Sequence, residues 1–230
     1  MSTYDDIVLP TPDLIDKKIK EFDNNEQLNE KALELLFNTF KSNTDEKEIL
    51  LKVVTLNNRY SAGLTDNFLN KEKCDIYEKE NKRKPTNVIV MTKHIAEIES
   101  QHHCFSSKEP DPIFIVKILR NIEGYQDSYS FATKYVAWTF RDKNIPIVDG
   151  YVKKLLYSIN KKSKEACFYE KLTWNDLEDY LTYCKVYELF VKHFKLEKYS
   201  YKQIDKYLWL YGKELAQGKN TQSQGTTPLQ

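Results

Sequence analysis

Apolar residues recur every three or four positions along most of this chain, which is the spacing of a helix with one buried face. In the first such stretch Thr11 is placed to cap the helix, and Pro12 occupies its first position. No run of more than five residues alternates apolar and polar positions as a half-buried strand does. The pattern therefore predicts an all-α fold of about nine or ten helices, with helical stretches at residues 12–22, 28–40, 49–57, 86–98, 112–119, 130–140, 149–159, 173–194 and 201–216.

The length of 230 residues suits one large domain or two closely packed lobes. We expect one all-α domain over residues 1–216, divided into lobes at roughly 1–120 and 121–216. Residues 217–230 are polar and low in complexity, so we expect a disordered tail there.

The composition excludes several classes of protein. Apolar residues make up 40% and charged residues 30%, and the mean hydropathy is −0.65, which describes a folded chain in water. No stretch reaches the ~20 apolar residues of a membrane span, and the acidic start lacks the pattern of a secretory signal. We therefore expect a cytoplasmic protein with no membrane partner.

Few residues supply turns or bind metals. Only 6 Gly and 7 Pro are present, which disfavours sandwiches, barrels and Gly-rich nucleotide folds. The 4 Cys form no C-x-x-C pair, and the sequence His102-His103-Cys104 has no further ligand at helical spacing. The usual hydrolase, metalloprotease, P-loop and dinucleotide motifs are also missing. We expect neither a metal site nor a cofactor.

Charge is divided unevenly along the chain. Residues 1–133 carry 18 Lys and Arg against 23 Asp and Glu, whereas residues 134–230 carry 17 against 11. A basic half is typical of a surface for a polyanion, although solvated helix faces of uneven charge give the same totals.

One pair of residues offers chemistry. Lys134 lies in an aromatic helix, and Asp149 follows 15 residues later at the start of the next helix. A partly desolvated lysine is a nucleophile for a sugar C1′, and a carboxylate at a helix start is stabilised by the backbone amides and stabilises positive charge. The alternative is that Asp149 only caps its helix and Lys134 reaches solvent.

The block SFATKYVAWTFRDKNIPIVDGYVKKLL at 130–156 resembles the helix, loop and catalytic-Asp helix of the helix-hairpin-helix DNA glycosylase superfamily. Pro146, Asp149 and Val152 match its P-x-x-D-x-x-V pattern, and Lys134 falls where bifunctional members carry their Schiff-base lysine. The resemblance implies a two-lobed protein that binds double-stranded DNA, flips out a base and cleaves its N-glycosidic bond without a cofactor. In that mechanism Lys134 attacks C1′, Asp149 stabilises the oxocarbenium charge, and strand cleavage is an optional lyase step.

Two flanking segments, LNNRYSAGL at 56–64 and YKQIDKYLWLYGKEL at 201–215, are also similar to small uncharacterised bacterial proteins with a related core. The segment 121–129 departs from the superfamily, because its hairpin has one glycine and two acids where the family has an L-P-G-V-G type turn. Phosphate anchoring by that turn is therefore in question.

The resemblance also directs attention to residues around the pair. Lys153, Lys154, Lys161 and Lys162 follow Asp149 and are candidates to contact the DNA backbone, with a solvated helix end as the alternative. Candidates for a base pocket are Arg59, Tyr60 and Trp138, and the alternative for the two aromatic residues is the core.

Three functions remain open from the sequence. The first is a DNA glycosylase with a lyase step. The second is a catalytically inactive glycosylase-like fold that acts as a nucleic-acid-binding or protein-interaction module. The third is a helical protein that binds a small molecule.

Overall fold

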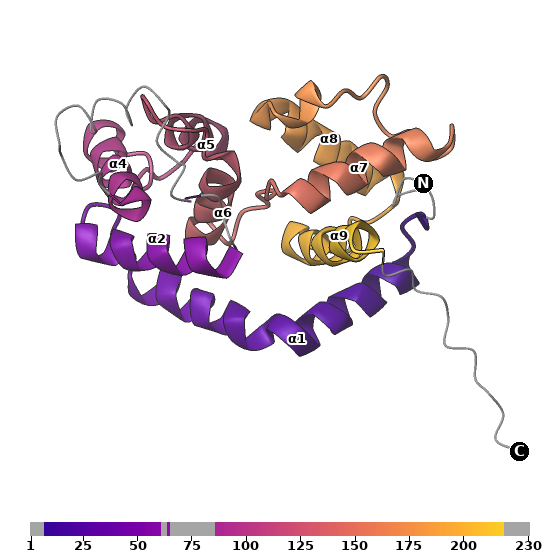
Figure 1. The fold of residues 1–230 in the computed structure, drawn as a ribbon, viewed down its shortest axis with the longest axis horizontal. Coiled ribbons are helices and arrows are strands. Elements are labelled where there is room, and N and C mark those ends of the chain that lie inside the picture. The colour runs from indigo at the N-terminus through magenta and orange to yellow at the C-terminus, as the bar shows by residue number, and fades with distance from the viewer. Residues whose placement is uncertain (1–6, 61–63, 65–85, 219–230) are drawn as a thin grey trace, which may run out of the picture.

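The computed structural model describes residues 7–60, 64 and 86–218, and this part of the chain is helical (Figure 1). The all-α class is confirmed for these residues, which contain no strand. Residues 219–230 of the expected tail lie outside the described ranges. The helices are α1 (Pro12–Thr39), α2 (Glu46–Tyr60), α4 (Asn87–His102), α5 (Pro112–Arg120), α6 (Tyr129–Thr139), α7 (Gly150–Lys162), α8 (Tyr180–His193) and α9 (Tyr201–Ala216), with a short 3-10 helix η1 (Asn175–Leu177).

Two of the predicted helix boundaries are wrong. The stretches predicted at 12–22 and 28–40 form one continuous helix, α1, because the polar residues 23–27 between them include neither Gly nor Pro. The stretch predicted at 173–194 is divided into η1 and α8. Asp179 makes this break, since its side chain accepts a hydrogen bond from the backbone N–H of Thr182 at 2.8 Å and thereby starts α8.

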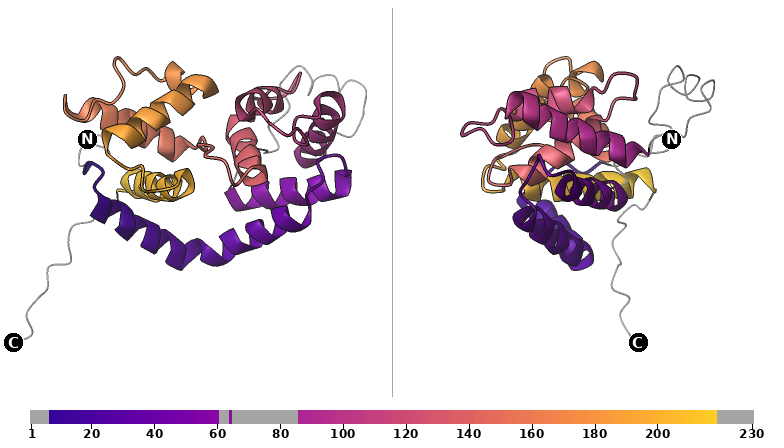
Figure 2. Two further views of the ribbon diagram at one scale, coloured as in Figure 1. Left: turned by 180° about the vertical axis from the view of Figure 1, so that it is seen from behind. Right: turned by 90° about the vertical axis from the view of Figure 1, so that its left-hand side faces the viewer.

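The helices form two groups that share α1 (Figures 1 and 2). In the first group α2 packs on α4 and α6, and α5 packs on α4 and α6. In the second group α7 packs on α9, and η1 packs on α8. Helix α1 contacts α2 and α6 with one part of its length and α9 with another. The segment 140–149 connects the groups, so the expected boundary near residue 120 falls inside the first group, between α5 and α6.

Helix α6 lies at the centre of the first group. Phe131 and Tyr135 are fully buried, and their rings stack with centroids 5.9 Å apart. Phe37 of α1 and Phe105 contact the Tyr135 ring edge-on, so residues from distant parts of the chain converge on this helix. Most of α6 is inaccessible to solvent, and any polar group on it therefore needs a partner.

In the second group, α9 approaches α7 closely. A Cβ atom added to Gly212 of α9 would lie 2.8 Å from the carbonyl oxygen of Tyr151 in α7, so only glycine fits this position without a shift. Helix α9 begins with a capping box between Ser200 and Gln203. Among the helices of the described ranges, none combines the length and the apolar character that crossing a membrane requires.

Candidate functional site

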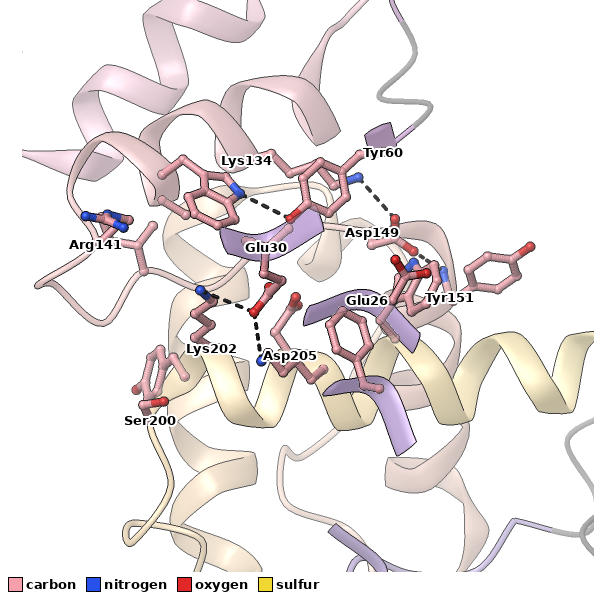
Figure 3. A pocket seen from close by; sticks show the side chains of 18 of the residues that line it. Glu26, Glu30, Tyr60, Lys134, Arg141, Asp149, Tyr151, Ser200, Lys202 and Asp205 are labelled. Atoms are coloured by element: carbon pink, nitrogen blue, oxygen red, sulfur yellow. Dashed lines mark hydrogen bonds and ion pairs between the residues drawn. The ribbon is translucent and has the colours of Figure 1, made fainter. Parts of the chain in front are cut away.

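A cavity with a volume of about 750 Å³ lies where the two groups of helices meet α1. Its walls come from α1, α2, α6, α7, α9 and the connecting segment 140–149 (Figure 3). This size is within the range of pockets that hold small organic groups. The residues that line it include Glu26, Glu30, Arg59, Tyr60, Lys134, Trp138, Asp149, Tyr151, Lys154, Lys202, Asp205 and Trp209.

Lys134 and Asp149 form an ion pair in the wall of this cavity (Figure 3). The lysine Nζ lies 3.2 Å from Oδ2 of Asp149 and donates to the Ser130 hydroxyl at 2.9 Å. Only 3% of the Lys134 surface is exposed, so the amine does not snorkel to bulk water as a surface lysine would. The spacing that the sequence singled out therefore brings the amine and the carboxylate into contact.

Asp149 has two tasks in the structure. Its Oδ1 accepts a hydrogen bond from the backbone N–H of Tyr151 at 2.9 Å and caps α7, while Oδ2 faces Lys134. The capping role and the pairing with Lys134 thus occur together. A carboxylate held by a helix start and a lysine is kept in one orientation, as acid–base and nucleophilic chemistry require.

The segment before Asp149 is held by three hydrogen bonds. The backbone N–H of Val148 donates to the Thr133 hydroxyl at 3.1 Å. From α8, the hydroxyl of Tyr180 donates to the Pro146 carbonyl at 3.0 Å and that of Tyr183 to the Ile147 carbonyl at 2.8 Å. Because both helix groups fix this segment, the position of Asp149 depends on tertiary contacts.

Tyr60 and Trp138 also meet at the cavity. The indole N–H of Trp138 donates to the Tyr60 hydroxyl at 3.2 Å, and Lys134 Nζ lies 5.3 Å from the centre of the Tyr60 ring. Burial raises the pKa of Tyr60 above its usual range, so this residue stays a neutral phenol. Trp138 is only 4% exposed, and Lys202 lies over its ring at 4.6 Å. Trp138 therefore holds Tyr60 in place, and little of its ring surface is free to stack on a base.

Basic residues outnumber acids around the cavity, with eight Lys and Arg against four Asp and Glu. Several are paired across elements. Arg59 of α2 forms an ion pair with Glu26 of α1, and Glu30 of α1 accepts Lys206 at 2.7 Å and Lys202 at 3.4 Å from α9. These pairs join α1 to both groups of helices at the cavity.

The four lysines predicted to contact DNA do not share one place. Lys154 is exposed and lines the cavity. Lys153 forms an ion pair with Glu178 at 2.6 Å and borders a second, smaller cavity of about 270 Å³. Lys161 and Lys162 are exposed at the end of α7, where Lys161 lies over the Tyr157 ring. Asp149 borders both cavities, but of these four lysines only Lys154 lines the one that also contains Lys134.

Asp205 of α9 is a cavity residue that sequence reasoning missed (Figure 3). Its Oδ1 atom is buried and has no hydrogen-bond partner. Burial, together with the nearby Asp149 carboxylate, raises the pKa of Asp205 to about 8. The sequence signal was weak, because an acid beside the apolar stripe of an amphipathic helix usually faces water. In the described ranges, no three His, Cys, Asp or Glu side chains gather where they could hold a metal ion.

Comparison with known proteins gives two matches. The family model HI_0787_N, described as an N-terminal domain, matches residues 14–143, which contain Tyr60 and Lys134 but neither Asp149 nor Asp205. A protein of Haemophilus influenzae named "Uncharacterized protein" is 37% identical over 87 residues, and the match covers 38% of each chain. The chain thus spans well under half the length of this curated relative. No solved structure matches significantly. Because the family model covers more than half of its residues, the chain belongs to the HI_0787_N N-terminal domain family.

Proposed function

We propose that this protein is a DNA base-excision glycosylase with a lyase step, which binds duplex DNA and cleaves an N-glycosidic bond. The observation that carries the proposal is the contact between Lys134 and Asp149 in the wall of the cavity. A primary amine that lies beside a carboxylate in a pocket wall, with little exposure to water, is suited to attack a sugar carbon.

The proposed reaction uses both residues. The Lys134 ammonium first gives a proton to Asp149, which lies 3.2 Å away. The Nζ lone pair then forms a bond to C1′ while the N-glycosidic bond breaks and its electron pair leaves with the base. The nitrogen then loses a second proton to water. The C1′–O4′ bond breaks as the last nitrogen proton moves to O4′, which leaves a 4′-hydroxyl and an imine between Lys134 and C1′. Asp149 passes this proton on to water before the sugar reacts, so its carboxylate then stabilises the positive charge that develops on the sugar in the transition state.

The cavity is suited to an extruded nucleotide. An enzyme that acts on C1′ in a duplex must take the nucleotide out of the stack and bind it in a pocket. A volume of about 750 Å³ is sufficient for a base and its sugar, and Tyr60, Tyr151 and Trp209 supply aromatic surface. The excess of basic over acidic residues in the cavity lining favours the phosphates on either side of the flipped nucleotide.

The hairpin that the resemblance assigns to DNA binding corresponds to α5, the turn 121–128 and α6. Helices α5 and α6 pack together, and Gly124 adopts the left-handed conformation with φ of 74°. The acid Asp127 in this turn is neutralised by an ion pair with Arg120. This pairing reduces the repulsion that an acidic turn would present to a phosphate.

Borohydride trapping tests the proposal, because it reduces an imine between the protein and the sugar to a stable amine. Duplex oligonucleotides with abasic, oxidised, deaminated and alkylated sites serve as substrates. We expect a covalent adduct with the wild type that is lost in Lys134→Gln and Lys134→Arg, the second of which keeps the positive charge opposite Asp149. Lys192→Gln, on an exposed part of α8, is the matched control and should trap normally.

The same experiment addresses the inactive-fold alternative. Wild-type protein that binds duplex DNA but neither releases a base nor forms an adduct with any substrate would contradict the glycosylase proposal. That result would favour a nucleic-acid-binding module. An adduct that persists in both Lys134 variants would show that another amine is the nucleophile.

A further inference from the structure

Asp205 lies in the same cavity as Lys134 and Asp149 but takes no part in the ion pair between them (Figure 3). Its side chain comes from α9, which faces the wall formed by α6 and the segment 140–149. Oδ1 is buried and has no hydrogen-bond partner, whereas most buried polar atoms in folded proteins have one. Asp205 itself lines the cavity, so its carboxyl group borders any molecule bound there.

The surroundings of Asp205 favour its neutral form. Burial and the neighbouring Asp149 and Glu30 carboxylates raise its pKa to about 8, against the opposing charge of Lys134. Of the three lysines on its own helix, Lys202 and Lys206 pair with Glu30, and Lys213 lies over the Trp209 ring, so none offsets this effect. The other titratable groups that face Asp205 are the phenols of Tyr60 from α2 and of Tyr183 and Tyr187 from α8.

We propose that Asp205 is the general acid that protonates the departing base, an inference that rests on the proposed glycosylase function. The carboxyl proton of Asp205 moves to a nitrogen or oxygen of the base as the N-glycosidic bond breaks. The electrons of that bond leave with the base, which departs as a neutral molecule. The Asp205 carboxylate that remains takes a new proton from water before the next turnover.

This role separates the tasks of the two cavity carboxyls. Asp149 has passed the Lys134 proton to water and faces the sugar as a carboxylate, so in the same step it has no proton to supply to the base. Within the described part of the chain Asp205 Oδ1 has no hydrogen-bond partner, so this carboxyl group is available to donate. Two carboxyl groups whose environments favour different protonation states are the usual arrangement for combined acid and base catalysis.

Asp205→Asn distinguishes proton donation from mere contact with the base. An amide keeps the shape of the protonated carboxyl, with one donor group and one acceptor group, but it does not release a proton. We expect base release at saturating enzyme to fall by about 10²-fold or more. Trapping on an abasic duplex should stay within about twofold of the wild type, because no base leaves in that reaction.

The pH dependence provides a second readout. Wild-type base release should decline as pH rises through about 8, where Asp205 loses its proton, and the residual activity of Asp205→Asn should lack this decline. Glu188→Gln, the same chemical change on an exposed part of α8, serves as control and should retain the wild-type profile.

Each outcome has one meaning. Normal base release by Asp205→Asn would overturn the general-acid role and leave Asp205 as a contact residue. Failure of the wild type to trap even an abasic duplex would instead overturn the glycosylase proposal on which this role rests. Loss of base release with retained abasic trapping supports both.

Discussion

Thr133 and Val148 are joined by a hydrogen bond from the Val148 backbone N–H to the Thr133 hydroxyl, with 3.1 Å between the nitrogen and the oxygen. Each of these residues directly precedes one member of the ion pair, Lys134 or Asp149. Thr133 is fully buried, and its hydroxyl in turn donates to the Ser130 carbonyl at 3.1 Å. This hydrogen bond joins α6 to the segment before α7. It thereby fixes the position of Lys134 relative to Asp149.

Replacing Thr133 by valine should therefore weaken both stability and catalysis. Valine keeps the shape but leaves the Val148 N–H buried without an acceptor, which costs about 1–3 kcal/mol of the free energy of unfolding. Denaturant unfolding measures this loss, and borohydride trapping on an abasic duplex measures the effect on the ion pair. Thr133→Ser keeps the hydroxyl and should trap at close to the wild-type rate. If the valine and serine variants had the same stability and the same trapping rate, the Thr133 hydroxyl would not be needed to position the ion pair.

Substitutions of Asp149 should separate its two tasks. Asp149→Asn keeps an N-cap for α7 but removes the charge that faces Lys134, so adduct formation should fall sharply while the α7 cap is retained. Asp149→Ala removes the cap as well and should be less stable than Asp149→Asn by about 1 kcal/mol. Urea unfolding of the two variants gives this difference. Wild-type trapping by Asp149→Asn would show that the carboxylate charge is dispensable.

The close approach of α9 to α7 predicts different results for two glycines. Gly212→Ala would place a Cβ atom 2.8 Å from the Tyr151 carbonyl oxygen, and backbone on both sides resists the shift, so we expect a loss of about 1–3 kcal/mol. At Gly150, in the first turn of α7, no atom lies within 4 Å of an added Cβ. Gly150→Ala should be neutral or slightly stabilising in thermal unfolding. Similar melting temperatures for the two variants would argue against this packing.

The sequence predicted the all-α class and the residues of the ion pair, because helical spacing and the helix start at Asp149 are local features. It did not show that Lys134 faces Asp149. That geometry depends on the aperiodic segment 140–149, which hydroxyls of α8 hold from a distant part of the chain. Asp205 was missed for the same reason, since only the packing of α9 brings it to the cavity.

The raised pKa of Asp205 predicts how stability depends on pH. Its pKa is raised from the ordinary aspartate value of 3.8 to about 8, so between these values the folded protein holds a proton that the unfolded chain has released. The contribution of Asp205 to stability is therefore most favourable at low pH, declines as pH rises through this window, and levels off above about 8. The melting temperature of Asp205→Asn should be higher than that of the wild type at pH 7–8, and this difference should become smaller toward pH 5. A constant difference between pH 5 and 8 would contradict the raised pKa.

The Glu30 carboxylate predicts an effect on DNA affinity. Glu30 accepts ion pairs from Lys202 and Lys206 at the cavity, so part of the positive charge there is neutralised within the protein. Glu30→Gln would release that charge toward the phosphates of a bound duplex. We expect tighter binding at low salt and a salt dependence steeper by up to about one counterion. Fluorescence anisotropy with a labelled duplex over a range of salt concentrations measures both. Glu188→Gln removes the same charge on an exposed part of α8 and controls for net charge. If both variants gain the same affinity, the added charge acts at long range and the cavity is not where the duplex binds.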